Sequence, residues 1–259
     1  MTTVWAVYFS GTGTTERTVT HIAGELARLL AAPCRSLDFT RPQARQQELN
    51  FCQSDLVVLG TPVYAGRVPN VLLPFLREKV RGGGALAVPV VLFGNRNYDD
   101  ALIELRDILQ QDGFRCVAAG AFVGEHSFSR TLGAGRPDDG DMAGQAGTEM
   151  APVLVRGETP IRPYYTPRDR YGNPINILKV KPKTDPDRCS GCGLCAELCP
   201  MGSIDPADVS QVRGICIKCC ACVKKCPSGA KYFDDPGYLF HQHELEDVYT
   251  RRAENEWFV

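Results

Sequence analysis

The sequence lacks an excess of charge of either sign. Its 29 lysines and arginines face 30 aspartates and glutamates, which leaves a formal net charge of -1 at pH 7. Nucleic acids and anionic membrane surfaces attract proteins through clustered positive charge, so this balance removes the usual electrostatic argument for either partner. We therefore expect no nucleic acid among the ligands of this protein.

Long hydrophobic runs are lacking as well. The longest uncharged stretch, 82–95, is too short to cross a bilayer as a helix, and glycine and proline interrupt it. The start of the chain, Met1 to Phe9, has no basic segment followed by a cleavage site, as a secretory signal would have. We expect no membrane anchor and a reducing, cytoplasmic location, since disulfide-stabilised secreted domains need an export signal.

The first part of the chain, 1–157, shows apolar runs that alternate with segments of helical periodicity. The apolar runs are continuous, which is typical of parallel strands covered on both faces. The pattern predicts strands at 4–9, 34–37, 56–60, 85–93 and 116–123, a helix that begins after residue 15, and helices at 70–79, 99–111 and 138–155. Such alternation predicts an α/β domain built on a doubly wound parallel sheet.

Three further segments follow the predicted α/β domain. Residues 158–183 are rich in proline and predict an extended linker. Residues 184–234 contain most of the cysteines, and residues 235–259 form an acidic, aromatic tail that we expect to pack on another part of the molecule.

Nine of the twelve cysteines lie between Cys189 and Cys226, in two copies of one motif. The segment 189–203 realigns on 216–230 with an offset of 27 residues, and each copy has the form C-x2-C-x2-C-x3-C-P. This run holds a 4Fe-4S cluster in bacterial ferredoxins, where the fourth cysteine binds the other cluster. The motif predicts one cluster on Cys189, Cys192, Cys195 and Cys226, and a second on Cys216, Cys219, Cys222 and Cys199.

A zinc ribbon is the alternative for this segment. It would use only Cys189, Cys192, Cys216 and Cys219, whose spacing resembles a ribbon. It would leave the third and fourth cysteines of each copy without a role, so we favour two clusters. Cys220 lies outside the spacing and is expected to be a spare thiol packed near the second cluster. Residues 179–233 resemble the two-cluster bacterial ferredoxin family, which implies a small α+β domain of two strands and two short helices.

A loop of hydroxyl residues and glycines joins the first predicted strand to the first helix. Its residues are Ser10, Gly11, Thr12, Gly13, Thr14 and Thr15. Backbone amides at a helix amino terminus favour an anion, and the hydroxyls add donors for a terminal phosphate. Glu16 stands where a dinucleotide fingerprint needs its third glycine, and the lysine of a nucleoside-triphosphate loop is missing. The loop therefore predicts a monophosphate site.

The sequence from Tyr8 to Thr15 resembles the FMN phosphate loop of flavodoxins. That resemblance implies a sheet in the order 2-1-3-4-5, with FMN bound where the carboxyl ends of the first and third strands meet. Two further loops follow the third and fourth strands and are implied as flavin contacts: Thr61, Pro62, Val63, Tyr64, Ala65 and Gly66, then Gly94, Asn95, Arg96, Asn97 and Tyr98.

The resemblance also implies a role for individual residues. Tyr64 is the candidate to stack on the isoalloxazine ring, with Tyr98 near its other face. Asn95 and Asn97 are candidates for the pyrimidine edge, and the Ala65–Gly66 peptide for flavin N5. His126 follows the fifth strand and is a candidate to approach the flavin, although a surface-loop histidine is favoured. Cys34, Cys52 and Cys116 are expected to be ordinary buried thiols.

The order of these parts resembles the flavodoxin-ferredoxin fusion proteins. That resemblance implies an electron carrier that moves low-potential electrons between FMN, two 4Fe-4S clusters and external redox proteins, with no catalytic residue required. The alternative is an FMN-dependent reductase of a small organic or quinone-like substrate, fed by the clusters. Whether the protein is an enzyme, and its oligomeric state, stay open at this point.

Overall fold

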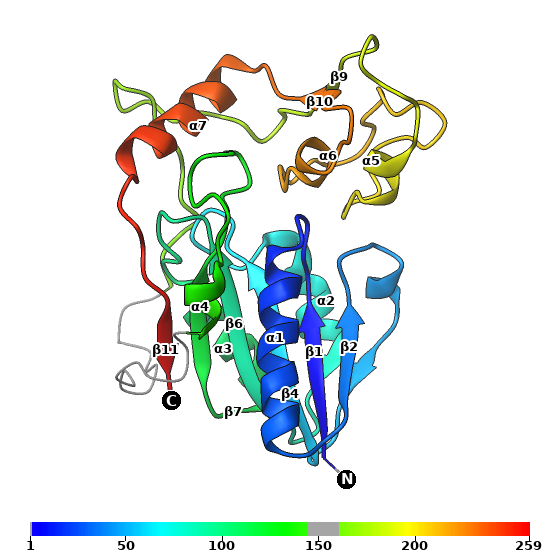
Figure 1. Cartoon of the computed structure of the whole chain (residues 1–259), viewed down its shortest axis with the longest axis vertical. Helices are drawn as coiled ribbons and strands as arrows, with labels where there is room; N and C mark the ends of the chain where they lie inside the picture. Colours follow the sequence, from blue (N-terminus) through cyan, green and yellow to red (C-terminus); the bar gives the residue numbers. More distant parts are fainter. Residues whose placement is uncertain (1, 144–160) are drawn as a thin grey trace.

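A parallel β-sheet lies at the centre of the amino-terminal half of the protein, shown in Figure 1 as a computed structural model that describes residues 2–143 and 161–259. Its neighbouring strands are, in order, β2 (Cys34–Asp38), β1 (Thr3–Tyr8), β4 (Asp55–Pro62), β6 (Leu86–Phe93) and β8 (Ala119–Val123). All four pairings are parallel. Counted among themselves in chain order, these five strands have the order 2-1-3-4-5, which confirms the predicted flavodoxin-like topology.

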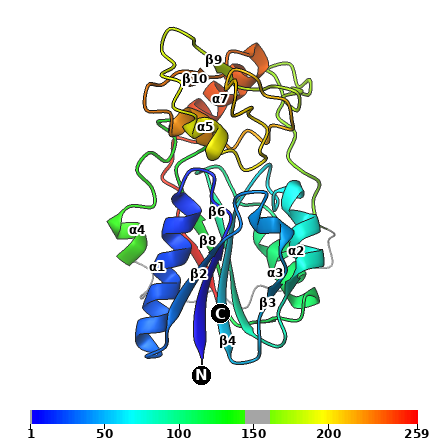
Figure 2. The same cartoon turned by 90° about the vertical axis from the view of Figure 1, so that its right-hand side faces the viewer.

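Helices cover both faces of the sheet (Figure 2). Helix α1 (Thr14–Leu29) lies on one face, and α2 (Leu73–Lys79) with α3 (Ala101–Gln111) lies on the other. Along β1, Val4 and Ala6 belong to the apolar cluster under α1, whereas Val7 belongs to the opposite cluster. Successive strand residues point to opposite faces, so both faces must be apolar when both are covered. This arrangement is the reason for the continuous apolar runs.

The predicted helices and strands differ from the structure in three places. The strand expected at 116–123 is split into β7 (Arg115–Cys116) and β8, which both pair with β6. The helix expected at 138–155 begins as α4 (Asp139–Ala143), and its remainder lies outside the described residues. The helix expected at 70–79 is a 3-10 turn, η2 (Asn70–Leu72), continued by α2. A second turn, η1 (Ala44–Gln46), precedes β3 (Leu49–Asn50), which pairs with β5 (Val80–Arg81).

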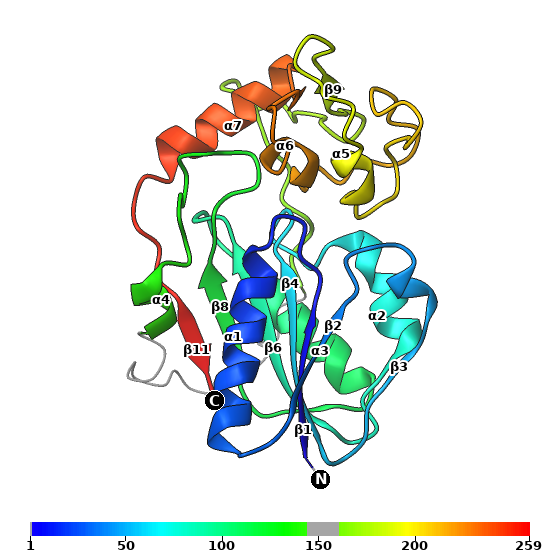
Figure 3. The ribbon, with the colours of Figure 1, turned by 45° about the vertical axis from the view of Figure 1, so that its right-hand side comes forward.

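The cysteine-rich half lies beyond the carboxyl ends of the parallel strands in all three views (Figures 1 to 3). It contains two short helices, α5 (Leu194–Glu197) and α6 (Ala221–Lys224). Two short strands, β9 (Lys183–Thr184) and β10 (Lys231–Tyr232), pair antiparallel. Two strands and two short helices are what the ferredoxin resemblance implied.

The carboxyl-terminal tail runs back from the cysteine-rich half to the sheet. Helix α7 (Pro236–Val248) begins with Asp235, whose carboxylate accepts a hydrogen bond from the Tyr238 amide, and a proline occupies its first position. Strand β11 (Glu256–Phe258) then pairs antiparallel with β8 at the edge of the sheet. The Trp257 ring lies edge-on to Phe122, with 4.6 Å between centroids. The tail thus covers a sheet edge that would otherwise be open.

The two halves are in direct contact. An Arg45 Nη2 donates to the carbonyl oxygen of Pro200 at 2.6 Å, and the Arg41 guanidinium pairs with Glu197 at 3.0 Å. On the opposite side, the Lys224 Nζ donates to the carbonyl oxygen of His126 at 2.7 Å and pairs with Glu125. These contacts hold the cysteine motifs against the loops at the carboxyl edge of the sheet.

Candidate functional site

The conformation of the loop between β1 and α1 is held by hydrogen bonds to the side chains of Ser10 and Thr40. The Ser10 hydroxyl accepts hydrogen bonds from the amides of Gly13 and Glu16, both at 3.1 Å. The Ser10 amide in turn donates to the hydroxyl of Thr40 at 2.8 Å. Gly13 precedes the helix with φ of 102°, a conformation that glycine adopts without steric cost. The serine therefore organises the loop from inside.

Several amides of this loop are left without an acceptor. Within the described part of the chain, no hydrogen bond is made by the backbone N–H groups of Gly11, Thr12, Thr14 and Thr15. Unpaired donors at the start of a helix, aided by the helix dipole, form a site for an anion such as a phosphate group. The geometry of the loop fits the monophosphate site expected from its sequence.

A cavity of about 480 Å³, solvent-open space included, lies beside this loop. Its walls come from the loop, from the ends of three strands and from the cysteine-rich half. The lining residues are Gly11, Thr12, Thr14, Thr15, Pro62, Val63, Tyr64, Leu92, Phe93, Gly94, Gly124, Glu125, His126, Ser127 and Cys219. A small-molecule site at the carboxyl ends of parallel strands, next to the strand-order reversal, is the position that this fold favours.

Residues 124–127 are a further part of this cavity, of which the sequence indicated only His126, as the less favoured of two alternatives. The His126 ring packs against Gly94, where an added Cβ would lie 2.3 Å from its Cδ2. Burial, together with the nearby Lys224, lowers the pKa of His126 to about 3, so its imidazole is neutral at pH 7. The side chain is half-buried and lines the cavity, so the favoured surface-loop interpretation was wrong and the alternative, a place beside this site, describes it better. The position after the fifth parallel strand was the available signal, because all the strand ends meet at one edge.

The loop after β4 contributes only part of its predicted residues to the cavity. Pro62, Val63 and Tyr64 line it, whereas the Ala65 carbonyl oxygen accepts a hydrogen bond from the Tyr165 amide at 2.7 Å. Gly66 has φ of 77° and faces the Asp99 carboxylate. Thr61 is fully buried, and its hydroxyl has no partner among the described residues.

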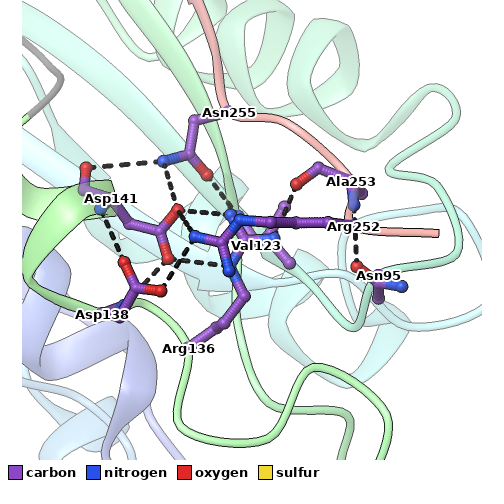
Figure 4. A network of polar contacts seen from close by, with 8 residues as sticks. All are labelled: Asn95, Val123, Arg136, Asp138, Asp141, Arg252, Ala253 and Asn255. Atoms are coloured by element: carbon purple, nitrogen blue, oxygen red, sulfur yellow. Dashed lines mark hydrogen bonds and ion pairs between the residues drawn. The ribbon is translucent and has the colours of Figure 1, made fainter. Parts of the chain in front are cut away.

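The loop after β6 contributes Gly94 to the cavity, but its other predicted residues are engaged elsewhere. The Asn95 side-chain amide donates to the carbonyl oxygens of Tyr249 and Arg251 at 2.8 and 2.6 Å, and its oxygen accepts from the Ala253 amide (Figure 4). Other contacts occupy the remaining side chains: Asn97 with the Asp99 amide, Tyr98 with Glu256, and Arg96 with Asp99 and the Tyr165 ring. The carboxyl-terminal tail and the linker thus hold this loop.

The first cysteine set surrounds a cavity of about 310 Å³ in the cysteine-rich half. Cys189, Cys192, Cys195 and Cys226 all line it. The cavity also includes Lys231, whose Nζ donates to the carbonyl oxygen of Val209. Three of these thiols come from one loop and the fourth from the other copy of the motif, as the crossing of ligands requires.

The second cysteine set surrounds a separate cavity of about 390 Å³. Cys199, Cys216, Cys219 and Cys222 line it, together with mainly apolar side chains such as Ile204, Ile217 and Phe233. Cys220, which lies outside the spacing, also lines this cavity, as expected for a thiol packed near the second set. Among the described residues, no three His, Cys, Asp or Glu side chains are placed to hold a single metal ion. The four thiols of each set instead lie around a space.

The two crossing cysteines have equivalent surroundings. Cys199 Sγ accepts a hydrogen bond from the Ser203 amide, and Cys226 Sγ accepts one from the Ala230 amide, both at 3.3 Å. Burial acts to raise the pKa of Cys226, but hydrogen bonds from the Ser228 hydroxyl and from nearby amides lower it to about 7. Gly202 and Gly229, at φ of 59° and 61°, turn these amides back toward the sulfurs.

The second motif carries side chains where the first has glycines. Gly191 and Gly193 have φ of 70° and 73°, and the residues that align with them, Lys218 and Cys220, keep left-handed values of 54° and 59°. Both side chains are buried and make contacts outside the motif. Lys218 Nζ donates to the carbonyl oxygen of Leu178 in the linker at 3.0 Å. These contacts offset the steric cost of a left-handed conformation.

Cys220 makes the corresponding contact to the tail. Its sulfur lies 3.3 Å from the Tyr238 hydroxyl of α7, and burial raises the pKa of the thiol to about 12. Cys220 lies outside the cysteine spacing and helps to join the motif to α7. The scattered cysteines differ from expectation: Cys34 and Cys52 are exposed and Cys116 is half-buried, so the prediction that they are buried thiols was wrong.

Comparison with known proteins agrees with this organisation. The family model described as 4Fe-4S binding domain matches residues 182–205, which include the first motif. No curated protein matches the chain.

Among the helices of the described residues, none is long and apolar enough to cross a bilayer.

Solved structures similar to this chain include an archaeal flavodoxin and a flavodoxin of Streptococcus pneumoniae TIGR4. The first is 13% identical, with a TM-score of 0.41, and the match covers 56% of this chain and 90% of that chain. The second is 16% identical, with a TM-score of 0.38 and coverages of 55% and 91%. The apo form of an NADH:FMN oxidoreductase is 21% identical, with a TM-score of 0.35 and coverages of 55% and 83%.

The strand order and the matched motif together characterise the chain. Its amino-terminal half has the parallel sheet of the flavodoxin-like fold. Its cysteine-rich half contains a 4Fe-4S ferredoxin domain. Such a combination supports an electron-transfer or redox role. The chain therefore combines a sheet of flavodoxin-like topology with a 4Fe-4S binding domain.

Proposed function

We propose that this protein is an electron carrier that binds one FMN in the cavity beside the Ser10–Thr15 loop and two 4Fe-4S clusters in the two cysteine cavities. The observation that carries the proposal is the complete separation of the thiols into two sets. The two cavities share no cysteine: each contains one complete predicted set, three thiols from one motif and one from the other, and the second cavity is also lined by Cys220. The two motifs predict this pairing for two clusters, whereas a zinc ribbon would use two cysteines from each motif.

The residues beside the loop fit the phosphate end of FMN. The four amides without an acceptor would bind the phosphate, and the hydroxyls of Thr12, Thr14 and Thr15 lie in the same wall. Lys225 adds a positive charge, since its Nζ lies 3.9 Å from the position of a Cβ on Gly13. Tyr64 and residues 124–127 are the walls available to the flavin ring.

When bound, FMN exchanges two electrons in single steps, and each cluster exchanges one. The protein's part is to hold these groups, tune them and limit access. The amides of Ser203 and Ala230 donate to cysteine sulfurs, and hydrogen bonds of this kind influence cluster potentials. His126, neutral at pH 7, and Cys219 close the flavin cavity.

The contacts that hold the loops around the cavity favour a carrier over a reductase of small substrates. Tyr165 of the linker engages the loop after β4, and the tail engages Asn95. Both segments hold the loops at the edge of the cavity in place, as suits a carrier whose cofactor site does not have to admit a second small molecule. The physiological partners in this proposal are redox proteins that exchange single electrons.

Anaerobic reconstitution with iron, sulfide and FMN tests the proposal. We expect about eight irons per FMN and cluster signals at low potential. Bound zinc, about four irons, or no uptake of FMN would contradict it.

A matched pair of cysteine variants tests the ligand assignment. Cys216→Ser is expected to halve the iron content, because it removes a ligand of the second set. Cys220→Ser keeps the full content, because Cys220 contacts Tyr238 and does not belong to either set of four. Loss of half the iron from Cys220→Ser would show that the assignment is wrong. Steady NADH oxidation by the purified protein alone would count against a carrier.

A further inference from the structure

Cys219 lines two cavities at once. It contributes to the cavity of the second cysteine set and to the cavity beside the Ser10–Thr15 loop. A Cβ placed on Gly11 would lie 3.1 Å from Cys219 Cβ, 3.6 Å from its Sγ and 3.8 Å from the Tyr64 hydroxyl. Cys219 and Tyr64 therefore lie so close to Gly11 that even a methyl group on this glycine would touch both. Cys219 is the one lining residue that the two cavities share in the described part of the chain.

The first cysteine set has a different position. None of the four thiols around its cavity lines the cavity beside the loop in the described part of the chain. Cys192 is exposed, as are the neighbouring Ser190 and Gly191, whereas Cys219 is 9% exposed. Lys225, the residue before Cys226, reaches Gly13 only with the end of its long side chain. Cys226 itself does not line the cavity beside the loop.

We infer that the second cysteine set is the inner electron-transfer site, which exchanges electrons with FMN across the Cys219 wall, and that the first set is the outer site, which exchanges them with a partner protein. This inference rests on the proposed function and adds the order of transfer. Electron transfer becomes much slower as the distance grows, so the cavity that shares a wall with the flavin site provides the fast route.

The electrons balance along this route. An external redox protein is oxidised by one electron as the outer cluster is reduced. The outer cluster is then reoxidised as the inner one is reduced, and the inner one is reoxidised as FMN takes up the electron. Two such passages and one proton from water convert FMN to its reduced anion. Electrons leaving the flavin follow the same route in reverse.

Two ligand variants of the full chain separate the inner from the outer site. Cys189→Ser removes the outer cluster and Cys216→Ser the inner one, and each variant should keep about four irons. Each is prepared without flavin, and the midpoint potential of the remaining cluster is followed by EPR before and after addition of FMN. The phosphate brings negative charge, which disfavours reduction of a nearby cluster.

We expect FMN to lower the midpoint potential of the cluster in Cys189→Ser clearly more than that in Cys216→Ser. An equal shift in the two variants, or a larger one in Cys216→Ser, overturns the inferred order. Wild-type protein that takes up no FMN refutes the proposed function instead, and the inference with it. FMN binding with the reversed pattern refutes the order alone.

A measurement on wild-type protein covers the case in which a variant loses all its iron. Partial removal of iron with a chelator, alkylation of the released thiols and peptide mass spectrometry identify which set is released first. We expect Cys189, Cys192, Cys195 and Cys226 to be labelled first, and bound FMN to slow the labelling of the other set more strongly. Earlier release of the second set, or equal or stronger protection of the first set by FMN, overturns the inference.

Discussion

A buried ion pair fastens the carboxyl-terminal tail to the sheet domain, and its removal gives a measurable prediction. The side chains of Arg136 and Asp141 are only 4% and 5% exposed. The Arg136 Nε donates to Asp141 Oδ2 at 2.7 Å, and a second N–H of the guanidinium donates to Oδ1. Arg136 Nη1 also donates to the carbonyl oxygen of Ala253 in the tail at 2.6 Å (Figure 4).

Asp141→Asn keeps the shape of the side chain but removes its charge. The Arg136 cation then stays buried without a carboxylate, and removal of one partner of a buried pair costs about 3–5 kcal/mol. Because asparagine still offers one acceptor oxygen, we expect a loss near the lower limit, about 3 kcal/mol of unfolding free energy. The tail should loosen with it, since Arg252 also reaches Asp141, at 3.2 Å.

Urea denaturation followed by circular dichroism measures the loss, and hydrogen exchange of the β11 amides reports on the tail. Glu25→Gln is the control, because it breaks the ion pair between Glu25 and Arg28 at the surface. The side chain of Arg28 is 66% exposed and that of Glu25 is 50% exposed. That change should cost less than about 0.5 kcal/mol. A loss of less than about 1 kcal/mol in Asp141→Asn, with unchanged exchange in β11, would refute the reasoning.

Three further predictions concern the core, the pH dependence and the phosphate loop. Gly60→Ala places a Cβ 2.3 Å from Cγ2 of the buried Val19. We expect the unfolding free energy from urea denaturation to fall by about 1–3 kcal/mol. Gly24→Ala, with open space around it, should be neutral or stabilising by comparison. Burial raises the pKa of Asp112 from 3.8 to about 6, so the folded state binds this proton more tightly than the unfolded chain does. The stability that Asp112 contributes is fully present below pH 3.8 and is lost as the pH rises through about 6. When the urea midpoint is measured against pH, Asp112→Asn should lack this pH-dependent loss. A variant with the pH profile of the wild type would contradict the assignment. Lys225→Gln should weaken FMN binding about threefold to tenfold at low salt and less at high salt. Fluorescence titration measures the FMN affinity of this variant, with Arg28→Gln as the control. Equal FMN affinities of the two variants would exclude a role for Lys225 at the phosphate.

Local patterns in the sequence predicted the parts of the molecule that depend on short stretches of chain. The continuous apolar runs of β1, β4 and β6 predicted strands covered on both faces, because each residue of such a strand faces one apolar layer or the other. The Ser10–Thr15 loop was also predictable from a short stretch of sequence. Its backbone N–H groups without acceptors result from a single turn between a strand and a helix.

Long-range contacts explain where the sequence-based expectations failed. Asn95 was expected at the pyrimidine edge of FMN by resemblance, yet its side chain is held by residues 249–253. His126 was expected at the surface, yet Lys224 and Gly94 enclose it. In each case the decisive neighbour lies far away in sequence or in another segment, and neither periodicity nor motif spacing reports such a neighbour.

The sequence by itself predicted parallel strands covered on both faces, an anion-binding loop and two sets of four cysteines, because these features depend on patterns within short segments. The order of the strands came from the resemblance to flavodoxins and is confirmed by the sheet. The tertiary structure decided how the two halves meet. It placed Cys219 in the wall of the cavity beside the Ser10–Thr15 loop, left Cys192 exposed, and returned the tail to the edge strand β8. The physical reason is that these placements depend on packing between surfaces of distant segments, and a linear pattern of residues does not specify which surfaces come together.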